Sequence, residues 1–219
     1  MFGQPALRQA AEFVGVQRLT RPELESFADT VVPDLIGHDV KLLFVGINPG
    51  LWTAAVQAHF ARRGNRFYPA LYRAGLIDRE IDASAGYLPE DRAHLLARGI
   101  GITNLVARAS ARADELSPDE LREGGRRLFE LVQSIQPPVI AVLGVTAYRL
   151  AFDDRTAAVG RQSAPIGRSQ LWVLPNPSGL NAHESAATLA AAYRQAGAAA
   201  GLVPHTGPAA QPLSPTRSS

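Results

Sequence analysis

The segment Gly46-Ile47-Asn48-Pro49-Gly50 places a carboxamide side chain directly after an apolar run at residues 41–45. An asparagine oxygen can orient a water by hydrogen bonding, but it has essentially no basicity and cannot act as a strong general base. Pro49 keeps the backbone of Asn48 extended, which holds the side chain in a fixed direction. Gly46 and Gly50 allow backbone N–H groups to come close to a ligand. The segment therefore predicts a site that orients a reactant and does not abstract a proton from it.

Other common catalytic patterns are missing from the sequence. The glycine spacing is wrong for a G-x-G-x-x-G dinucleotide loop, and no Gly-Lys-Ser/Thr follows as in a P-loop. The sequence has no cysteine, and its five histidines lack metal-ligand spacing such as H-E-x-x-H. The histidines are His38, His59, His94, His183 and His205. We predict no metal and no cofactor.

Four β-like runs alternate with helical patterns along the chain. The runs cover residues 41–45, 100–106, 139–144 and 171–174, and the first and third are continuously apolar, as in strands covered on both faces. Helices are predicted near residues 65–75, 89–97, 118–135, 145–152 and 184–199. The alternation predicts an α/β fold, a three-layer α/β/α sandwich with a short, mostly parallel four-stranded sheet.

The carboxyl ends of the predicted strands carry the polar residues that could form a site. Asn48 follows the first strand, Asn104 ends the second, and the loop at residues 175–179 follows the fourth. Ligands of such folds bind at the carboxyl ends of the strands. We therefore expect these three segments to meet around one ligand.

Length and composition suggest the organisation of the chain. A chain of 219 residues suits one substantial core. We predict an N-terminal helical extension at residues 1–36, one α/β domain at 37–200 and a disordered tail at 201–219, which is rich in Pro, Ser, Thr and Gly. The lack of a secretion signal, of a membrane-length apolar run and of cysteine favours a bacterial cytoplasmic or nucleoid location without membrane contact. Because the formal net charge is only +2, any nucleic-acid binding must depend on local arginine clusters.

Three stretches of the sequence are specific when they are taken together. The first joins Gly46–Gly50 to Phe60, 64–68 and 74–76, the second covers 99–106 and 123–126, and the third covers 172–180. In order and spacing they resemble the mismatch-specific uracil and thymine DNA glycosylases of the uracil-DNA glycosylase superfamily. The resemblance extends from about residue 38 to about residue 196, so it identifies the domain at 37–200 as uracil-DNA glycosylase-like.

The resemblance implies roles for residues around a flipped base. It implies that Asn48 positions the attacking water, that Phe60 stacks on the pyrimidine and that Asn104 contacts the edge of uracil. It also places three further residues near the base: Gly46, Ile47 and Ser110. From residue type alone, Phe60 would be ordinary core, and Asn104 could cap a turn.

The resemblance also implies an intercalation loop at residues 175–181. Leu180 would be the apolar wedge that fills the space left by the flipped base. Ser178, Gly179 and Asn181 would contact DNA beside it. Asn176 stands where faster relatives carry a histidine that stabilises the leaving pyrimidine, so that assistance is expected to be missing. Ala182-His183 stands where the family has an arginine.

A cluster of arginines follows the first motif. Arg62, Arg63 and Arg66 are candidates for contacts to DNA phosphates, and a solvated surface is the alternative. Three acids, Asp91, Asp114 and Glu115, flank the second strand and are candidates for an auxiliary base.

The resemblance implies a monofunctional hydrolase, monomeric and without cofactor, that removes uracil from double-stranded DNA and prefers G:U mispairs. Three alternatives stay open. One is a broad-range uracil glycosylase that also acts on single strands, and the second is a non-catalytic DNA- or nucleotide-binding module on the same fold. The third is a small-molecule enzyme on a flavodoxin-like fold.

Overall fold

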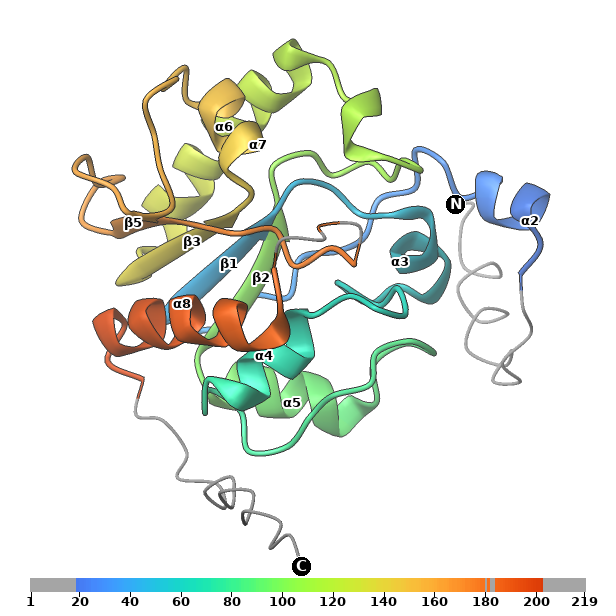
Figure 1. Cartoon of the computed structure of the whole chain (residues 1–219), viewed down its shortest axis with the longest axis horizontal. Helices are drawn as coiled ribbons and strands as arrows, with labels where there is room; N and C mark the ends of the chain where they lie inside the picture. The colour runs from blue at the N-terminus through green and yellow to red at the C-terminus, as the bar shows by residue number, and fades with distance from the viewer. Residues whose placement is uncertain (1–18, 180, 182–183, 203–219) are drawn as a thin grey trace, which may run out of the picture.

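The apolar runs of the sequence form the strands of one sheet. The computed structural model describes residues 19–179, 181 and 184–202. Within them the strands are β1 (Leu42–Gly46), β2 (Ile100–Asn104), β3 (Val139–Leu143), β4 (Gly160–Arg161) and β5 (Gln170–Leu174). Their order is β2-β1-β3-β5-β4, and every neighbouring pair is parallel except β4 and β5 (Figure 1). The mostly parallel sheet is confirmed, but the predicted count of four strands is low by one, because a two-residue strand leaves no period-two pattern.

Alternate residues of each strand enter two separate hydrophobic cores. In β1, Leu42 and Phe44 face one core, whereas Leu43 and Val45 face the other, and all four side chains are fully buried. This is the period of two that strand geometry requires. It explains why the first run is continuously apolar.

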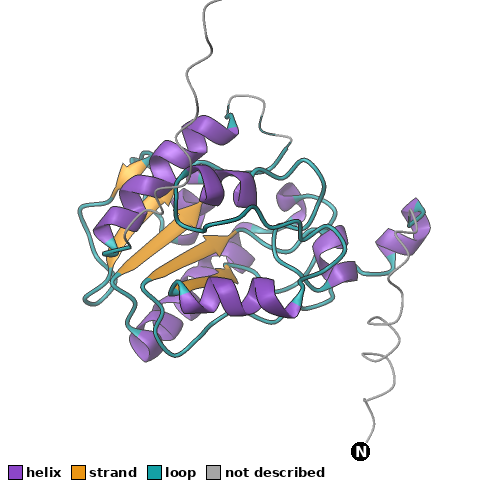
Figure 2. Ribbon diagram, turned by 90° about the horizontal axis from the view of Figure 1, so that it is seen from below, coloured by secondary structure: helices purple, strands orange, loops and turns teal. Residues whose placement is uncertain are grey.

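Helices cover both faces of the sheet. The described residues contain α2 (Arg21–Glu25), α3 (Leu51–Val56), α4 (Phe67–Arg73), α5 (Pro89–Ala97), α6 (Pro118–Ile135), α7 (Val145–Ala151) and α8 (Ala186–Ala199). Helices α4, α5 and α8 pack on the core of Phe44, and α6 and α7 pack on the core of Val45, so the three-layer sandwich is confirmed (Figures 1 and 2). The sequence does not predict α3, because six residues are too few to show helical periodicity.

Helix α6 begins where its capping residues predict. Ser117 Oγ accepts from the Glu120 N–H at 3.2 Å, and the Glu120 carboxylate accepts from the Ser117 N–H at 2.9 Å. Further along, a Cβ on Gly124 would lie well under 3.0 Å from the Leu105 carbonyl oxygen. This close approach packs α6 against the backbone that directly follows β2.

The segment before β1 lies along the edge of the sheet. Leu35 and Ile102 exchange two backbone hydrogen bonds of 2.8 Å, and Val31 forms an antiparallel bridge with Arg108. Of the predicted extension at 1–36, residues 19–36 are described, and only α2 is helical in them. Residues 31–35 are not helical, and Leu35 covers the edge of β2 by pairing with Ile102. The domain boundaries stay a prediction, and residues 1–18 and 203–219 lie outside the described residues.

The described part of the chain has no helix with the length and apolar composition needed to cross a membrane.

Candidate functional site

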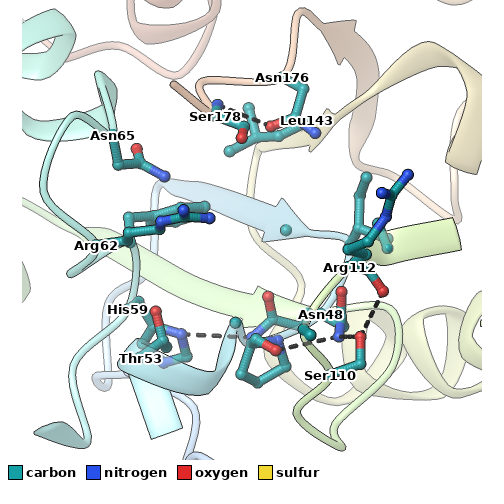
Figure 3. A pocket seen from close by; sticks show the side chains of 18 of the residues that line it. Asn48, Thr53, His59, Arg62, Asn65, Ser110, Arg112, Leu143, Asn176 and Ser178 are labelled. Atoms are coloured by element: carbon teal, nitrogen blue, oxygen red, sulfur yellow. Dashed lines mark hydrogen bonds between the residues drawn. The ribbon is translucent and has the colours of Figure 1, made fainter. Parts of the chain in front are cut away.

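A pocket of about 770 Å³ lies at the carboxyl ends of the parallel strands, where the sequence places the site. Gly46, Asn104 and Leu143 end β1, β2 and β3 on its lining, and Asn176 follows β5. Figure 3 shows Leu143 and Asn176 among the residues around this pocket. The predicted site residues on the lining are Gly46, Ile47, Asn48, Phe60, Arg62, Asn104, Ser110, Ser178 and Asn181. Those not on the lining are Arg63, Arg66 and Gly179, and Leu180 lies outside the described residues.

The Asn48 carboxamide is held through its nitrogen. Nδ2 donates to Ser110 Oγ at 2.8 Å and to the carbonyl oxygens of Pro49 at 3.1 Å and Arg108 at 3.3 Å. Because carbonyl oxygens only accept hydrogen bonds, the amide nitrogen must face them. The Asn48 oxygen is then the end of the amide that is turned away from Ser110, as Figure 3 shows. Asn48 therefore presents a fixed acceptor on the lining of the pocket.

Ser110 fixes the direction of this amide. Its side chain is 3% exposed, and Oγ donates to the Arg112 carbonyl oxygen at 2.6 Å. With its proton used in this way, Oγ can only accept from Asn48. The Ser110 N–H also donates to the Pro49 carbonyl at 3.1 Å, which ties the loop after β2 to the Asn48 turn. The predicted contact of Ser110 with a base stays a prediction, but the structure gives Ser110 a role in orienting Asn48.

Gly46 lies between Phe60 and Asn104. A Cβ on Gly46 would lie 3.3 Å from Phe60 Cζ and well under 3.0 Å from Asn104 Oδ1. Phe60 stacks on Phe67 with ring centroids 4.0 Å apart and an interplanar angle of 25°. The backbone of Phe60 has a φ of 56°, an unfavourable conformation that costs roughly 1–3 kcal/mol for a bulky residue. The fold thus holds this ring in place at the pocket, and the absence of a side chain on Gly46 leaves room for the Phe60 ring and the Asn104 amide.

The Asn104 carboxamide contacts a buried histidine. Asn104 Nδ2 lies 3.4 Å from His59 Nδ1, a long hydrogen bond. On the other side of the imidazole, Nε2 lies 3.0 Å from the Pro33 carbonyl oxygen. The Tyr68 hydroxyl donates to the His59 carbonyl oxygen at 2.9 Å, which also fixes the backbone. Both the ring and the main chain of His59 are therefore fixed at the pocket wall.

Burial keeps this imidazole neutral. The His59 side chain is 2% exposed, and burial lowers the pKa of His59 to about 4, although the Pro33 carbonyl opposes the shift and Arg92 adds slightly to it. The neutral ring has one donor nitrogen and one acceptor nitrogen. Since the Pro33 carbonyl can only accept, Nε2 carries the proton and Nδ1 is the acceptor.

The loop after β5 is stabilised by its own amides. Asn176 Oδ1 accepts from the Ser178 N–H at 3.0 Å, and Asn181 Nδ2 donates to the Asn176 carbonyl at 3.2 Å. The Asn176 oxygen is thus used within the loop. Its amide cannot ionise, so it cannot provide the cationic support that a histidine would give a leaving anion.

Arg66 supports this loop from the neighbouring segment. Its Nη1 donates to the carbonyl oxygens of Ser178 at 3.1 Å and Asn181 at 3.0 Å, and its backbone N–H donates to the Pro177 carbonyl at 2.9 Å. A Cβ on Gly179 would lie 2.7 Å from the Gly64 carbonyl oxygen, so a glycine is required where the two loops cross. Phosphate binding by Arg66 stays a prediction, and the structure adds a supporting contact that the sequence did not predict.

The three candidate carboxylates differ in position. Asp91 is 2% exposed, accepts from Arg79 Nη1 at 2.6 Å and caps α5, and it is not on the pocket lining. Glu115 is not on the lining either. Asp114 is on the lining, but a hydrogen bond from Arg112 lowers the pKa of its carboxyl. A carboxylate that is stabilised in its ionised form is a poor proton acceptor. No group of three His, Asp or Glu side chains in the described residues could hold a metal ion.

The lining includes three polar residues to which the sequence assigns no role, Thr53, His59 and Asn65, whereas Arg112, also on the lining, is a further candidate for phosphate contacts by its residue type. Thr53 lies on α3, which the sequence does not predict. Asn65 Oδ1 accepts from the N–H of Phe67, the first residue of α4, at 2.9 Å. His59 stands directly before Phe60, and this adjacency is the signal that the sequence offers, because metal-ligand spacing does not reveal such a histidine.

Known proteins share the family and the fold of this chain. Residues 33–196 match the family model described as the uracil DNA glycosylase superfamily. The solution NMR structure of a candidate uracil DNA glycosylase from Methanosarcina acetivorans is similar to this chain, with a TM-score of 0.50 and 16% sequence identity. That similarity covers 76% of this chain and 97% of the other, and at this identity it is a similarity of fold.

Proposed function

Because the chain belongs to the uracil DNA glycosylase superfamily, whose members are hydrolytic glycosylases that act on DNA, we propose that it removes uracil from double-stranded DNA and prefers G:U mispairs. This is the activity of the mismatch-specific subfamily that the sequence resembles. The observation that supports it most strongly is the fixed Asn48 amide. A reaction that only needs an oriented water requires an acceptor of this kind on the pocket wall.

We propose that the pocket receives a single flipped base. Flipping costs a few kcal/mol and costs least at a mispair, which gives a physical source of mismatch preference. We propose that the uracil enters the space beside Gly46, against the Phe60 ring, with its polar edge toward Asn104. Base–aromatic stacking contributes roughly 1–3 kcal/mol per base in other proteins.

In the proposed reaction Asn48 Oδ1 accepts a hydrogen bond from a water and directs its oxygen at the sugar carbon C1′. The C1′–N1 bond breaks, and its electron pair leaves with uracil as an N1 anion. Because an amide has almost no basicity, the water keeps its proton until positive charge has developed on the sugar. The proton then passes to solvent.

This arrangement makes the rate depend on the leaving base. The Asn176 amide is uncharged, so it cannot stabilise the leaving anion as a cation would. Asp114 is paired with Arg112, which makes it a poor proton acceptor for the water. We therefore expect slow turnover and faster excision of pyrimidines with electron-withdrawing substituents. Equal single-turnover rates for uracil and 5-fluorouracil would contradict this part of the mechanism.

The loop at residues 175–181 is proposed to enter the DNA stack with Leu180 as its wedge. Arg66 holds the carbonyls of Ser178 and Asn181 on either side of that position, so the loop is stabilised before DNA arrives. Arg62 and Arg63 are exposed beside it and are proposed to bind phosphates.

A second candidate activity is broad-range excision that includes uracil in single strands. The sequence has Ala182-His183 where the family has an arginine after the wedge, which favours weaker discrimination at the opposite strand.

The test is single-turnover excision, read as alkali-induced strand cleavage, on one sequence carrying G:U, A:U, G:T or single-stranded uracil. Faster cleavage of G:U than of A:U and of single strands supports the mismatch-specific activity. Equal rates for all uracil substrates support the broad-range enzyme, and retention of the DNA on a gel without cleavage would show a binding module instead.

A further inference from the structure

His59 contacts the residue proposed to read the base, and the proposed mechanism gives it no role. Asn104 has a carboxamide whose two ends differ only in hydrogen bonding, so the side chain can present either end to a ligand. Uracil has an O4 acceptor beside an N3–H donor, whereas cytosine has an N4 amine donor beside an N3 acceptor. An amide that is free to rotate by half a turn could pair with either base. Selection of uracil therefore needs something that fixes the amide.

The contacts of His59 supply that constraint. Nε2 lies 3.0 Å from the Pro33 carbonyl oxygen and must donate to it, so Nδ1 carries a lone pair and accepts. The atom placed 3.4 Å from Nδ1 is Asn104 Nδ2, which is the only end of that amide able to donate. Reversing the amide would place two acceptors, Nδ1 and Oδ1, against each other inside a buried wall.

The fixed amide leaves one edge for the base. One N–H of Nδ2 is used by His59, while Oδ1 and the second N–H remain side by side. Oδ1 lies next to Gly46, well under 3.0 Å from the place a Cβ would take, which puts it at the space that the base is proposed to enter. Uracil can satisfy both groups by donating N3–H to Oδ1 and accepting at O4. Cytosine in the same position would meet a donor with its amine and an acceptor with its bare N3.

We propose that His59 is a positioning residue that locks the Asn104 carboxamide and so makes the pocket select uracil over cytosine. The inference rests on the proposed function, since it concerns the base that this pocket receives. His59 itself touches neither the sugar carbon nor the water. It acts through the orientation of its neighbour.

The surroundings of His59 are rigid enough for this role. Tyr68 donates to the His59 carbonyl at 2.9 Å, and the Tyr68 and Tyr87 hydroxyls lie 2.6 Å apart. The imidazole is 2% exposed. A ring held at its backbone, at Nε2 and by packing cannot turn over to present its N–H to Asn104.

A matched pair of variants tests the lock. His59→Leu removes both ring nitrogens, whereas His59→Asn also loses the bond to Pro33 but can present an amide oxygen near the position of Nδ1. Single-turnover excision is measured for each protein on a G:U duplex and on the same duplex with a C:A mispair. The ratio of the uracil rate to the cytosine rate is calculated for each protein and compared between proteins. Because all proteins act on the same two duplexes, the difference in the cost of flipping the two bases cancels in this comparison.

The expected result is a change in selectivity. His59→Leu should lower uracil excision by about two- to tenfold, because a rotating amide is correct part of the time, and should lower the uracil-to-cytosine ratio at least tenfold. His59→Asn should return the ratio toward wild type. A purely structural role predicts parallel losses on both substrates, and an unchanged ratio in His59→Leu would overturn the inference.

The wild-type protein provides a second measurement that does not depend on the variants folding. The ¹⁵N chemical shifts of the His59 ring at neutral pH distinguish a protonated from an unprotonated Nδ1. An unprotonated Nδ1 is expected, and a protonated Nδ1 would exclude the lock regardless of activity. A wild-type enzyme that releases no uracil would instead refute the proposed function.

Discussion

Gly46→Ala is the substitution whose effect the structure defines most sharply. The added methyl group would lie 3.3 Å from Phe60 Cζ and well under 3.0 Å from Asn104 Oδ1, so the Asn104 amide must move. Forcing an extra methyl into a packed site costs about 1–3 kcal/mol. At about 1.4 kcal/mol per tenfold change in rate, the same strain corresponds to roughly 5- to 150-fold slower uracil excision. The free energy of unfolding should fall by a similar 1–3 kcal/mol.

Gly50→Ala is the matched control for this substitution. Gly50 is in the same motif and on the same pocket, but a Cβ there has no atom within 4 Å, and its φ of −75° is ordinary for alanine. Single-turnover excision of uracil from a G:U duplex is measured for both variants, with urea denaturation as the stability check. We expect Gly50→Ala to stay within about twofold of wild type, since nothing crowds the added methyl. Equal rates in the two variants would refute the placement of the base beside Gly46.

Three further predictions follow from single contacts. Ser110→Ala removes the acceptor that lies 2.8 Å from Asn48 Nδ2. The loss of this hydrogen bond, worth about 1 kcal/mol, should slow G:U excision roughly fivefold because the Asn48 amide is then less well oriented. An unchanged rate would count against the role of Ser110. Arg66→Met removes two bonds to the wedge loop, so excision from duplex DNA should fall more than excision from single strands, measured as the ratio of the two rates; a parallel fall would contradict this. The pKa of His59 is about 6.5 in the unfolded chain and about 4 in the folded protein. Between these two pH values the unfolded chain binds more protons than the folded one. The free energy of unfolding should therefore fall by about 3 kcal/mol as the pH drops from 6.5 to 4. Urea denaturation across this range should show that loss in wild type and not in His59→Asn, and matching pH profiles would contradict the low folded pKa.

The fold was predictable because its signals are local. The run at 41–45 is apolar at every position since β1 is covered on both faces, and Ser117 with Glu120 marks the start of α6 by a capping pair three residues apart. The elements that were missed or misjudged lack such signals. Strand β4 has two residues and α3 has six. The segment at residues 31–35 is held by the pairing of Val31 with Arg108 and of Leu35 with Ile102, contacts that are distant in sequence.

The sequence predicted the positions of the site residues that belong to a recognisable motif, but not the hydrogen bonds that orient them. Asn48 and Asn104 could be placed because strand ends converge at one edge of a parallel sheet. The bonds that orient them could not be seen, because Ser110 is 62 residues from Asn48 and His59 is 45 residues from Asn104. A buried neutral histidine also leaves no spacing pattern. What it accepts and donates depends on the carbonyl and amide that the fold brings to it.

The most direct test of the account is single-turnover release of uracil from a G:U duplex by Asn48→Ala, with thermal unfolding to confirm that the variant is folded. Arg122→Ala, on the outer face of α6, is the surface control. We predict that Asn48→Ala slows release at least 100-fold while Arg122→Ala stays near wild type, because a water without its acceptor is no longer directed at the sugar carbon. Release within about threefold of wild type by a folded Asn48→Ala protein would contradict the account.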